Sequence, residues 1–240
     1  MKPLGAQELL DVADQSIRLN WVDRGLLLAR YASAGALSRA CEDLPLAIRD
    51  RLILGLRIAT FGPQLSLQAR CGGCGEQLEA ELDGAAMLAS HLEDPPEATT
   101  VHIENKELSL RMPTSRDLDS VAGLPSEQAH WGLLRRCLAD ASVELDDQLR
   151  SAAAAALESA DPFSALELEL VCQQCGKGTV TQLDLVSFVL SEITDAAHRV
   201  AAQIHQLALA YGWTEAEILQ LPEARRRRYL QFITDGASAP

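Results

Sequence analysis

Aromatic residues are scarce in this sequence, and it contains no long apolar run. Aromatics make up 4% of the 240 residues, whereas hydrophobic residues make up 48%, with Leu and Ala dominant. This composition favours packed helices over aromatic-rich sheets, and the length is sufficient to bury a substantial core. No stretch is long and apolar enough to span a bilayer, so we expect no membrane insertion. We expect an α+β fold that is mainly α.

Positive charge is also in deficit. The formal net charge is −13, and a chain of this charge repels a polyanion, which disfavours nucleic-acid binding through phosphate contacts. The only concentrated positive charge is the run Arg225–Arg228. It is a solvated helix face or a docking surface for an acidic partner, with nucleic acid as a third option, and the sequence leaves these interpretations open.

The N-terminus lacks the apolar segment of a secretion signal. Lys2 is soon followed by Glu8 and Asp11, which leaves no apolar h-region. We therefore expect a cytoplasmic protein. Cytoplasmic thiols stay reduced, so paired cysteines point to metal or redox chemistry and not to disulfides.

Catalytic motifs are missing as well. Gly72 and Gly73 lie between two cysteines and do not form a glycine-rich phosphate loop. The five histidines are scattered along the chain and form no hydrolase constellation. Nothing in the sequence supports an enzyme, and we expect no small-molecule substrate.

Four of the six cysteines form two C-x-x-C pairs, and the other two are single. The pairs are Cys71 with Cys74 and Cys172 with Cys175. Four thiolates are the number that a closed tetrahedral structural zinc site needs. A redox site would place its cysteine pair at a helix N-terminus, but each pair here is followed by glycine and a predicted strand. Buried thiols that bind no metal are a further alternative. We predict one structural Zn²⁺ held by all four thiolates, with Cys41 and Cys137 as small core residues.

An internal duplication explains why the two pairs lie so far apart. Both cysteines recur at an offset of 101 residues (172 − 71 and 175 − 74), and residues 65–75 overlay residues 166–176 at that offset. In each copy, alternating apolar residues indicate a strand, glycine closes a knuckle, and a second strand leads to an aspartate that caps a helix. The glycines are Gly75 and Gly176, and the aspartates are Asp83 and Asp184. We predict duplicated helix-strand-zinc knuckle-strand-helix units joined at a zinc-ribbon-like site.

Further elements are predicted around these units. A long helix runs from Asp184 to Tyr211 and ends at Gly212, and Thr214 with Glu217 forms a capping box for the next helix. The remaining predictions are helices at Trp21–Tyr31 (capped by Asp23), Leu46–Ala59 and Asp146–Ser159, and a hairpin that pairs Thr100–Glu104 with Glu107–Met112.

We divide the chain into three parts. Residues 1–90 hold the N-terminal helices and the first zinc-knuckle lobe, and residues 91–184 hold the hairpin, helices and the second zinc-knuckle lobe. Residues 185–240 form the long helix and a C-terminal helical hairpin, which extends the duplicated region.

The C-terminal segment resembles the ending of a known family. Its residues run from Ile204 through Tyr211, Gly212 and Trp213 to Glu217, Ile218 and Leu219, and then to Arg226, Tyr229 and Leu230. Shorter segments agree, at Leu44–Leu52, Leu56–Gly62, Leu110–Leu118 and Leu183–Phe188. Over about residues 15–235, the chain is similar to the baseplate hub assembly chaperones of T-even phages and their relatives in contractile injection systems.

The resemblance implies a non-enzymatic protein that helps to build, or is retained in, the baseplate of a contractile tail or tail-like particle. Its partners would be hub or baseplate protein subunits. The apolar residues of the C-terminal helices, Phe232 among them, either close the core or form an exposed anchor for such a subunit. The candidate partner-binding residues are Tyr211, Trp213, Ile218, Leu219, Arg226, Arg227 and Tyr229. The alternative function is a zinc-ribbon regulator that binds nucleic acid through the arginine run.

Overall fold

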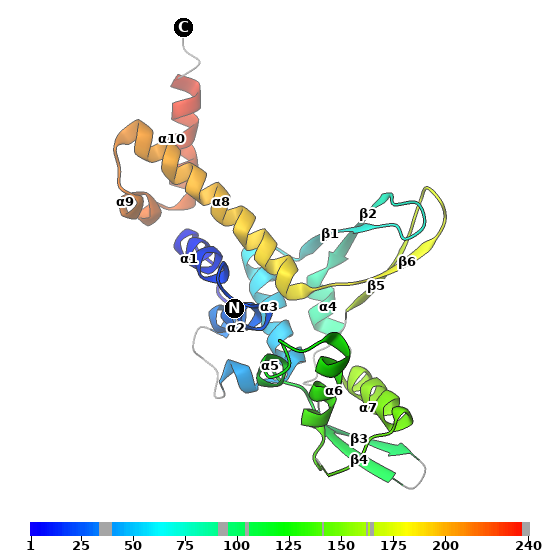
Figure 1. Ribbon diagram of the computed structural model, residues 1–240. Coiled ribbons are helices and arrows are strands. Elements are labelled where there is room, and N and C mark those ends of the chain that lie inside the picture. The colour runs from blue at the N-terminus through cyan, green and yellow to red at the C-terminus, as the bar shows by residue number, and fades with distance from the viewer. Residues whose placement is uncertain are drawn as a thin grey trace. The chain divides into compact units, whose positions relative to one another are not determined.

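The structure is a computed structural model, and it describes residues 1–33, 40–90, 96–103, 106–140, 142–161, 163 and 166–236. Its helices are α1 (Ala6–Ser16), α2 (Trp21–Ser33), α3 (Leu46–Phe61), α4 (Gly84–Ser90), α5 (Ser115–Asp119), α6 (Ser126–Cys137), α7 (Asp147–Ala160), α8 (Leu185–Tyr211), α9 (Glu215–Gln220) and α10 (Glu223–Gly236) (Figure 1). A 3₁₀ helix covers Cys41–Asp43. The strands are β1 (Gln64–Arg70), β2 (Gln77–Asp83), β3 (Ala98–Ile103), β4 (Lys106–Arg111), β5 (Glu167–Val171) and β6 (Gly178–Gln182).

The strands pair as three separate antiparallel hairpins, β1–β2, β3–β4 and β5–β6. The predicted α+β class, mainly α, is confirmed. The chain divides into two compact units, one of residues 1–3 and 19–188 and one of residues 4–18 and 189–240. The division into 1–90, 91–184 and 185–240 stays a prediction. Within the described residues, none of the helices has both the length and the apolar character needed to cross a bilayer.

The helix α2 packs along α3 in the first unit. The side chain of Asn20 accepts hydrogen bonds from the amides of Val22 (2.8 Å) and Asp23 (2.9 Å) and so caps α2. The prediction that Asp23 is the cap is wrong, because Asn20 directly precedes the helix and reaches its free amides first. The helix α3 ends at Gly62, whose φ of +94° stops the helical conformation there.

The hairpin β3–β4 packs against α6 and α7 around a small core of its own. Val101 pairs with Leu108 across the two strands, and Asp146 caps α7 by accepting the amide of Leu149 at 2.8 Å. The buried residues of this core are Leu108, Leu110, Leu134, Cys137, Leu138, Leu149 and Ala153. Cys137 is fully buried and Cys41 is 9% exposed, which confirms that both single cysteines are core residues.

Two buried carboxylates in the first unit are held by arginines. Arg111 donates to both oxygens of Asp117, at 2.6 and 2.7 Å, and the amide of Thr114 donates to one of them at 3.0 Å. Asp50 accepts a hydrogen bond from the Nε of Arg49 at 2.7 Å. Bidentate and buried pairs of this kind fix the geometry of the segments that carry them.

The hairpins β1–β2 and β5–β6 both lead into a cysteine turn, and they lie side by side in Figure 1. Leu65 and Leu67 of β1 point inward and their neighbours along the strand are exposed. The strand β5 shows the same alternation in a less buried form. The predicted strand on either side of each cysteine turn is therefore confirmed.

The second unit contains α1, most of α8, and the two C-terminal helices α9 and α10. α8 ends at Gly212, which has a φ of +69°. The predicted capping box opens α9, because Glu217 accepts the amide of Thr214 at 2.8 Å and the hydroxyl of Thr214 accepts the amide of Glu217 at 3.3 Å.

Candidate metal centre

The two cysteine turns have the same backbone hydrogen bonds. The amide of Cys71 donates to the carbonyl of Glu76 at 2.8 Å, and the amide of Gly75 donates to the carbonyl of Cys71 at 3.0 Å. In the second turn Cys172 donates to Lys177 at 3.0 Å and Gly176 donates to Cys172 at 2.9 Å. Each turn needs a left-handed residue, supplied by Gly75 (φ +77°) and Gly176 (φ +71°).

These turns bring the four sulfur atoms together. The Sγ atoms of Cys71 and Cys175 are 3.6 Å apart, and those of Cys74 and Cys172 are also 3.6 Å apart. All four sulfurs lie within 4.8 Å of one another, and all four cysteines are free thiols. A disulfide would bring two sulfurs to about 2.05 Å. The cluster is thus a set of four thiol ligands that could hold one metal ion.

Each turn contributes one buried and one exposed cysteine. Cys71 is 4% exposed and Cys172 is 1% exposed, and both belong to a small apolar cluster with Leu78. Cys74 and Cys175 are exposed. Ala69 and Leu170 pack against this cluster, which is small.

Two hydrogen bonds link the turns directly beside the sulfurs. Lys177 Nζ donates to the carbonyl of Gly72 at 3.2 Å, and the amide of Gly72 donates to the hydroxyl of Thr179 at 3.3 Å. A methyl group on Gly73 would lie 2.8 Å from the Lys177 side chain and 3.3 Å from the Sγ of Cys175. Glycine at this position therefore allows the two turns to approach closely.

Backbone amides lower the pKa of the Cys71 thiol. The amides of Cys74 and Gly73 point at its sulfur and lower the pKa of Cys71 to about 6. The amide of Glu76 acts in the same direction on Cys74, but the neighbouring sulfurs and burial outweigh it and raise the pKa of Cys74 to about 12. A bound cation would remove this conflict, because metal binding favours the thiolate form of every ligand.

Gly75→Ala is expected to destabilise the metal-loaded protein by about 1 to 2 kcal/mol, because an L-residue with a side chain is strained at a φ of +77°. Gly72→Ala is the matched control in the same turn. Its added methyl group meets no atom within 4 Å and its φ is not positive. Denaturant unfolding with saturating metal measures both variants, and equal losses of stability would contradict the role given to Gly75.

The structure brings three of the seven candidate partner-binding residues into one aromatic cluster. The rings of Tyr211 and Trp213 stack with centroids 4.7 Å apart, and Tyr229 meets them edge-on at 5.6 and 5.0 Å. Phe232 joins at 6.3 Å from Tyr229. Tyr211 is 38% exposed and Phe232 is 56% exposed. We call these four residues the aromatic cluster.

The other candidate residues are not all on the surface. Ile218 is fully buried and Arg226 is 5% exposed, with Arg226 donating to the carbonyl of Leu221 at 2.9 Å. A partner would not touch these two side chains in this conformation. Leu219 is partly buried, and Arg227 is exposed and forms an ion pair with Glu223.

Sequence reasoning missed exposed apolar residues in the second unit. Leu209 is 75% exposed and Ile17 is 72% exposed. The exposure of Leu209 could have been predicted, because Leu209 does not lie on the apolar face of the helix that places Leu207 in the core.

Comparisons with known proteins give no match. No protein-family model, curated protein or solved structure matches the chain. The four-cysteine cluster and the aromatic cluster are therefore interpreted from their own geometry.

Proposed function

We propose that the four-cysteine cluster holds one structural zinc ion. Sulfurs about 2.3 Å from a tetrahedral zinc lie about 3.8 Å from one another. The Cys71–Cys175 and Cys74–Cys172 sulfur pairs, at 3.6 Å, are close to that spacing, and the remaining pairs stay within 4.8 Å. Four protein ligands leave no open position for substrate, which favours a structural role over a catalytic one.

The two cysteine hairpins are, in the same proposal, products of an internal duplication. Features of the first hairpin recur in the second at the offset of 101 residues, including the turn hydrogen bonds and the positive φ. The helix caps recur as well, since Asp83 accepts the amide of Ala86 at 3.1 Å and Asp184 accepts that of Ser187 at 3.0 Å. Zinc then joins two related knuckles into one scaffold.

On this scaffold the protein acts as a non-enzymatic assembly factor or structural component of the baseplate of a contractile phage tail or tail-like injection system. The observation that carries the proposal is the aromatic cluster, which lies in the segment whose sequence resembles the family. Two of its four side chains, Tyr211 and Phe232, are exposed, and exposed aromatic side chains are typical of protein-binding surfaces. The partner is a hub or baseplate subunit, and the protein is made in the cytoplasm, with retention in the finished particle as one outcome.

The alternative, a zinc-ribbon regulator that binds nucleic acid, has less support from the arginine run. Arg226 is buried, and Arg227 forms an ion pair with Glu223. The other two arginines of the run, Arg225 and Arg228, are exposed. Two arginines on a chain with a net charge of −13 give weak attraction for phosphates. A titration with duplex DNA and RNA at several salt concentrations decides this, and binding that weakens steeply with salt would favour the regulator.

Phe232→Glu is expected to weaken binding to the baseplate or hub subunit by about tenfold or more, because burying a charge in an aromatic contact removes about 2 kcal/mol or more of binding energy. Phe232 is 56% exposed, so the fold should survive. Binding is measured by calorimetry against each purified baseplate and hub subunit encoded beside the gene.

Ile17→Glu is the control, since Ile17 is a 72% exposed apolar residue outside the aromatic cluster. A chain that ends at Gly212 is less informative than the point variant, because Ile218 is fully buried and its loss also exposes apolar surface. Full binding by Phe232→Glu, or no binding of the native chain to any of these subunits, would reject the proposed function.

A further inference from the structure

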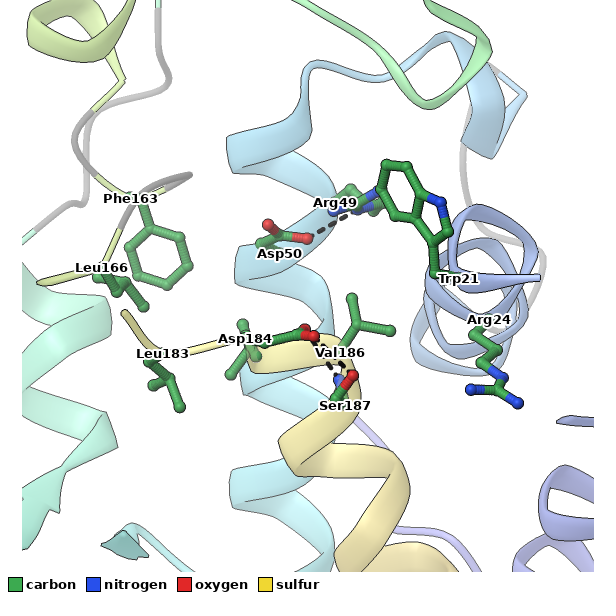
Figure 2. Close-up of a pocket in the computed structure, with 11 residues that line it drawn as sticks. Trp21, Arg24, Arg49, Asp50, Phe163, Leu166, Leu183, Asp184, Val186 and Ser187 are labelled. Atoms are coloured by element: carbon green, nitrogen blue, oxygen red, sulfur yellow. Dashed lines mark hydrogen bonds and ion pairs between the residues drawn. The ribbon is translucent and has the colours of Figure 1, made fainter. Parts of the chain in front are cut away.

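A small pocket in the first unit is lined by residues that the metal centre and the aromatic cluster do not use. It has a volume of about 220 Å³ and lies between the first turns of α2 and α8, beside α3 (Figure 2). Pockets for small-molecule ligands usually measure about 300 to 1,000 Å³. The size of this pocket suits one long side chain better than a whole small molecule.

Asp50 supplies a buried carboxylate to this pocket. The residue is 8% exposed, and its Oδ1 accepts the hydrogen bond from Arg49. Figure 2 shows the second oxygen turned away from Arg49. No hydrogen bond to that oxygen is found among the described residues. This oxygen keeps its capacity to accept a hydrogen bond from a donor that enters the pocket, and a charged donor would form the stronger bond.

The charges around Asp50 favour a cation as that donor. Burial raises the pKa of Asp50, Arg49 lowers it, and the carboxylates of Asp161 and Asp184 raise it again. Arg49 is also committed elsewhere, because its Nη1 donates to the hydroxyl of Ser115 at 3.2 Å. Besides Arg49, two further carboxylates act on Asp50, and a cation that entered beside Asp50 would be attracted to them.

The rest of the lining suits an aliphatic stem. Phe163, Leu166 and Leu183 provide apolar walls, and Trp21 stands at the rim with 52% of its surface exposed. The face of an indole ring attracts a cation. Arg24 also lines the pocket, but Figure 2 shows its guanidinium pointing away from Asp50.

We propose that this pocket binds the side chain of a lysine or arginine of a protein partner. The stem lies against Phe163 and Leu183, and the charged end reaches the second oxygen of Asp50. This goes beyond the proposed function, because it assigns a contact site to residues 19–188 that does not depend on the aromatic cluster.

The test uses the zinc-loaded full-length protein and capped tripeptides with a central lysine or arginine. A tripeptide with central norleucine is the matched neutral probe, since it keeps an aliphatic stem without the charge. The readouts are the indole N–H signal of Trp21, assigned with Trp21→Phe, and the backbone amides of Val186 and Ser187 in NMR titrations. Both cationic peptides are expected to give saturable shifts with dissociation constants on the order of millimolar, and the norleucine peptide to give none.

Asp50→Asn is expected to weaken binding of the cationic peptides at least fivefold, whereas Asp14→Asn, which removes an exposed carboxylate outside the pocket, leaves it unchanged. Trp21→Ala provides a second variant at an exposed position, read from the amides of Val186 and Ser187, and is expected to weaken binding about threefold.

Three results would overturn the proposal. They are the absence of saturable shifts with both cationic peptides, equal shifts with the norleucine peptide, and unchanged binding in both Asp50→Asn and Trp21→Ala. Free cadaverine separates the two sources of an alkylammonium group. Tighter binding of cadaverine than of the peptides would assign the pocket to a free diamine and contradict a protein side chain.

Discussion

Cys172→Ser is expected to abolish tight zinc binding and to lower the free energy of unfolding by at least about 3 kcal/mol. A structural zinc contributes its binding free energy to folding, and apparent values of about 10 to 16 kcal/mol are typical of small zinc domains. Cys172 is 1% exposed, and the apolar cluster around it is small. The two cysteine hairpins thus have little else to hold them together when a ligand is lost. Urea unfolding in zinc-buffered solution measures the effect.

Cys41→Ala is the control for loss of a thiol. Cys41 is buried but lies with Leu26 and Ala29 in another cluster. It should keep full zinc content and lose about 1 kcal/mol through the small cavity that remains. A native-like stability of Cys172→Ser, or a loss no larger than that of Cys41→Ala, would show that the sulfur cluster does not bear on the stability of the fold.

Asp117→Ala is expected to cost about 3 kcal/mol of stability at neutral pH. The substitution removes the bidentate pair with Arg111 and the hydrogen bond from the amide of Thr114 at the start of α5. Asp117 is 3% exposed, whereas the Arg111 side chain is 45% exposed and can regain water. Thermal and urea unfolding measure the loss. Asp119→Ala, an exposed carboxylate on the same helix, should change stability by less than about 0.5 kcal/mol.

The contribution of Asp117 should also depend on pH. Burial raises its pKa, but hydrogen bonds from Arg111 and Thr114 outweigh burial and lower the pKa of Asp117 below the usual 3.8. A carboxylate with a lowered pKa stabilises the fold above pH 3.8 and loses that effect as the pH falls through the folded-state value. The difference between the native chain and Asp117→Ala should therefore shrink in acid. A difference that grew below pH 4 would contradict the assignment.

Local sequence signals were sufficient for the four-cysteine cluster and for many helix ends. Glycine after each cysteine pair predicted the left-handed residues Gly75 and Gly176, and Asp83 and Asp184 were predicted as caps because few other residues accept free amides at a helix start. The two C-x-x-C pairs predicted that the four sulfur atoms would lie together. These features depend on residues close together in sequence, so a single chain reveals them.

Features that depend on tertiary packing were not predictable. The pocket around Asp50 combines α2, α3, residue 163 and the start of α8, and no local pattern links these segments. Ile218 and Arg226 were assigned to a partner surface but are buried. A helix of six residues such as α9 has too few turns to define its inward face from apolar spacing alone.

Metal analysis of the purified protein is the most direct test of the central claim that zinc joins the two knuckles. The native chain, expressed in medium with ordinary trace metals and dialysed, should contain about one zinc per chain by mass spectrometry. Cys172→Ser should contain almost none. A fully folded native chain without zinc, or one that holds iron in its place, would contradict the account.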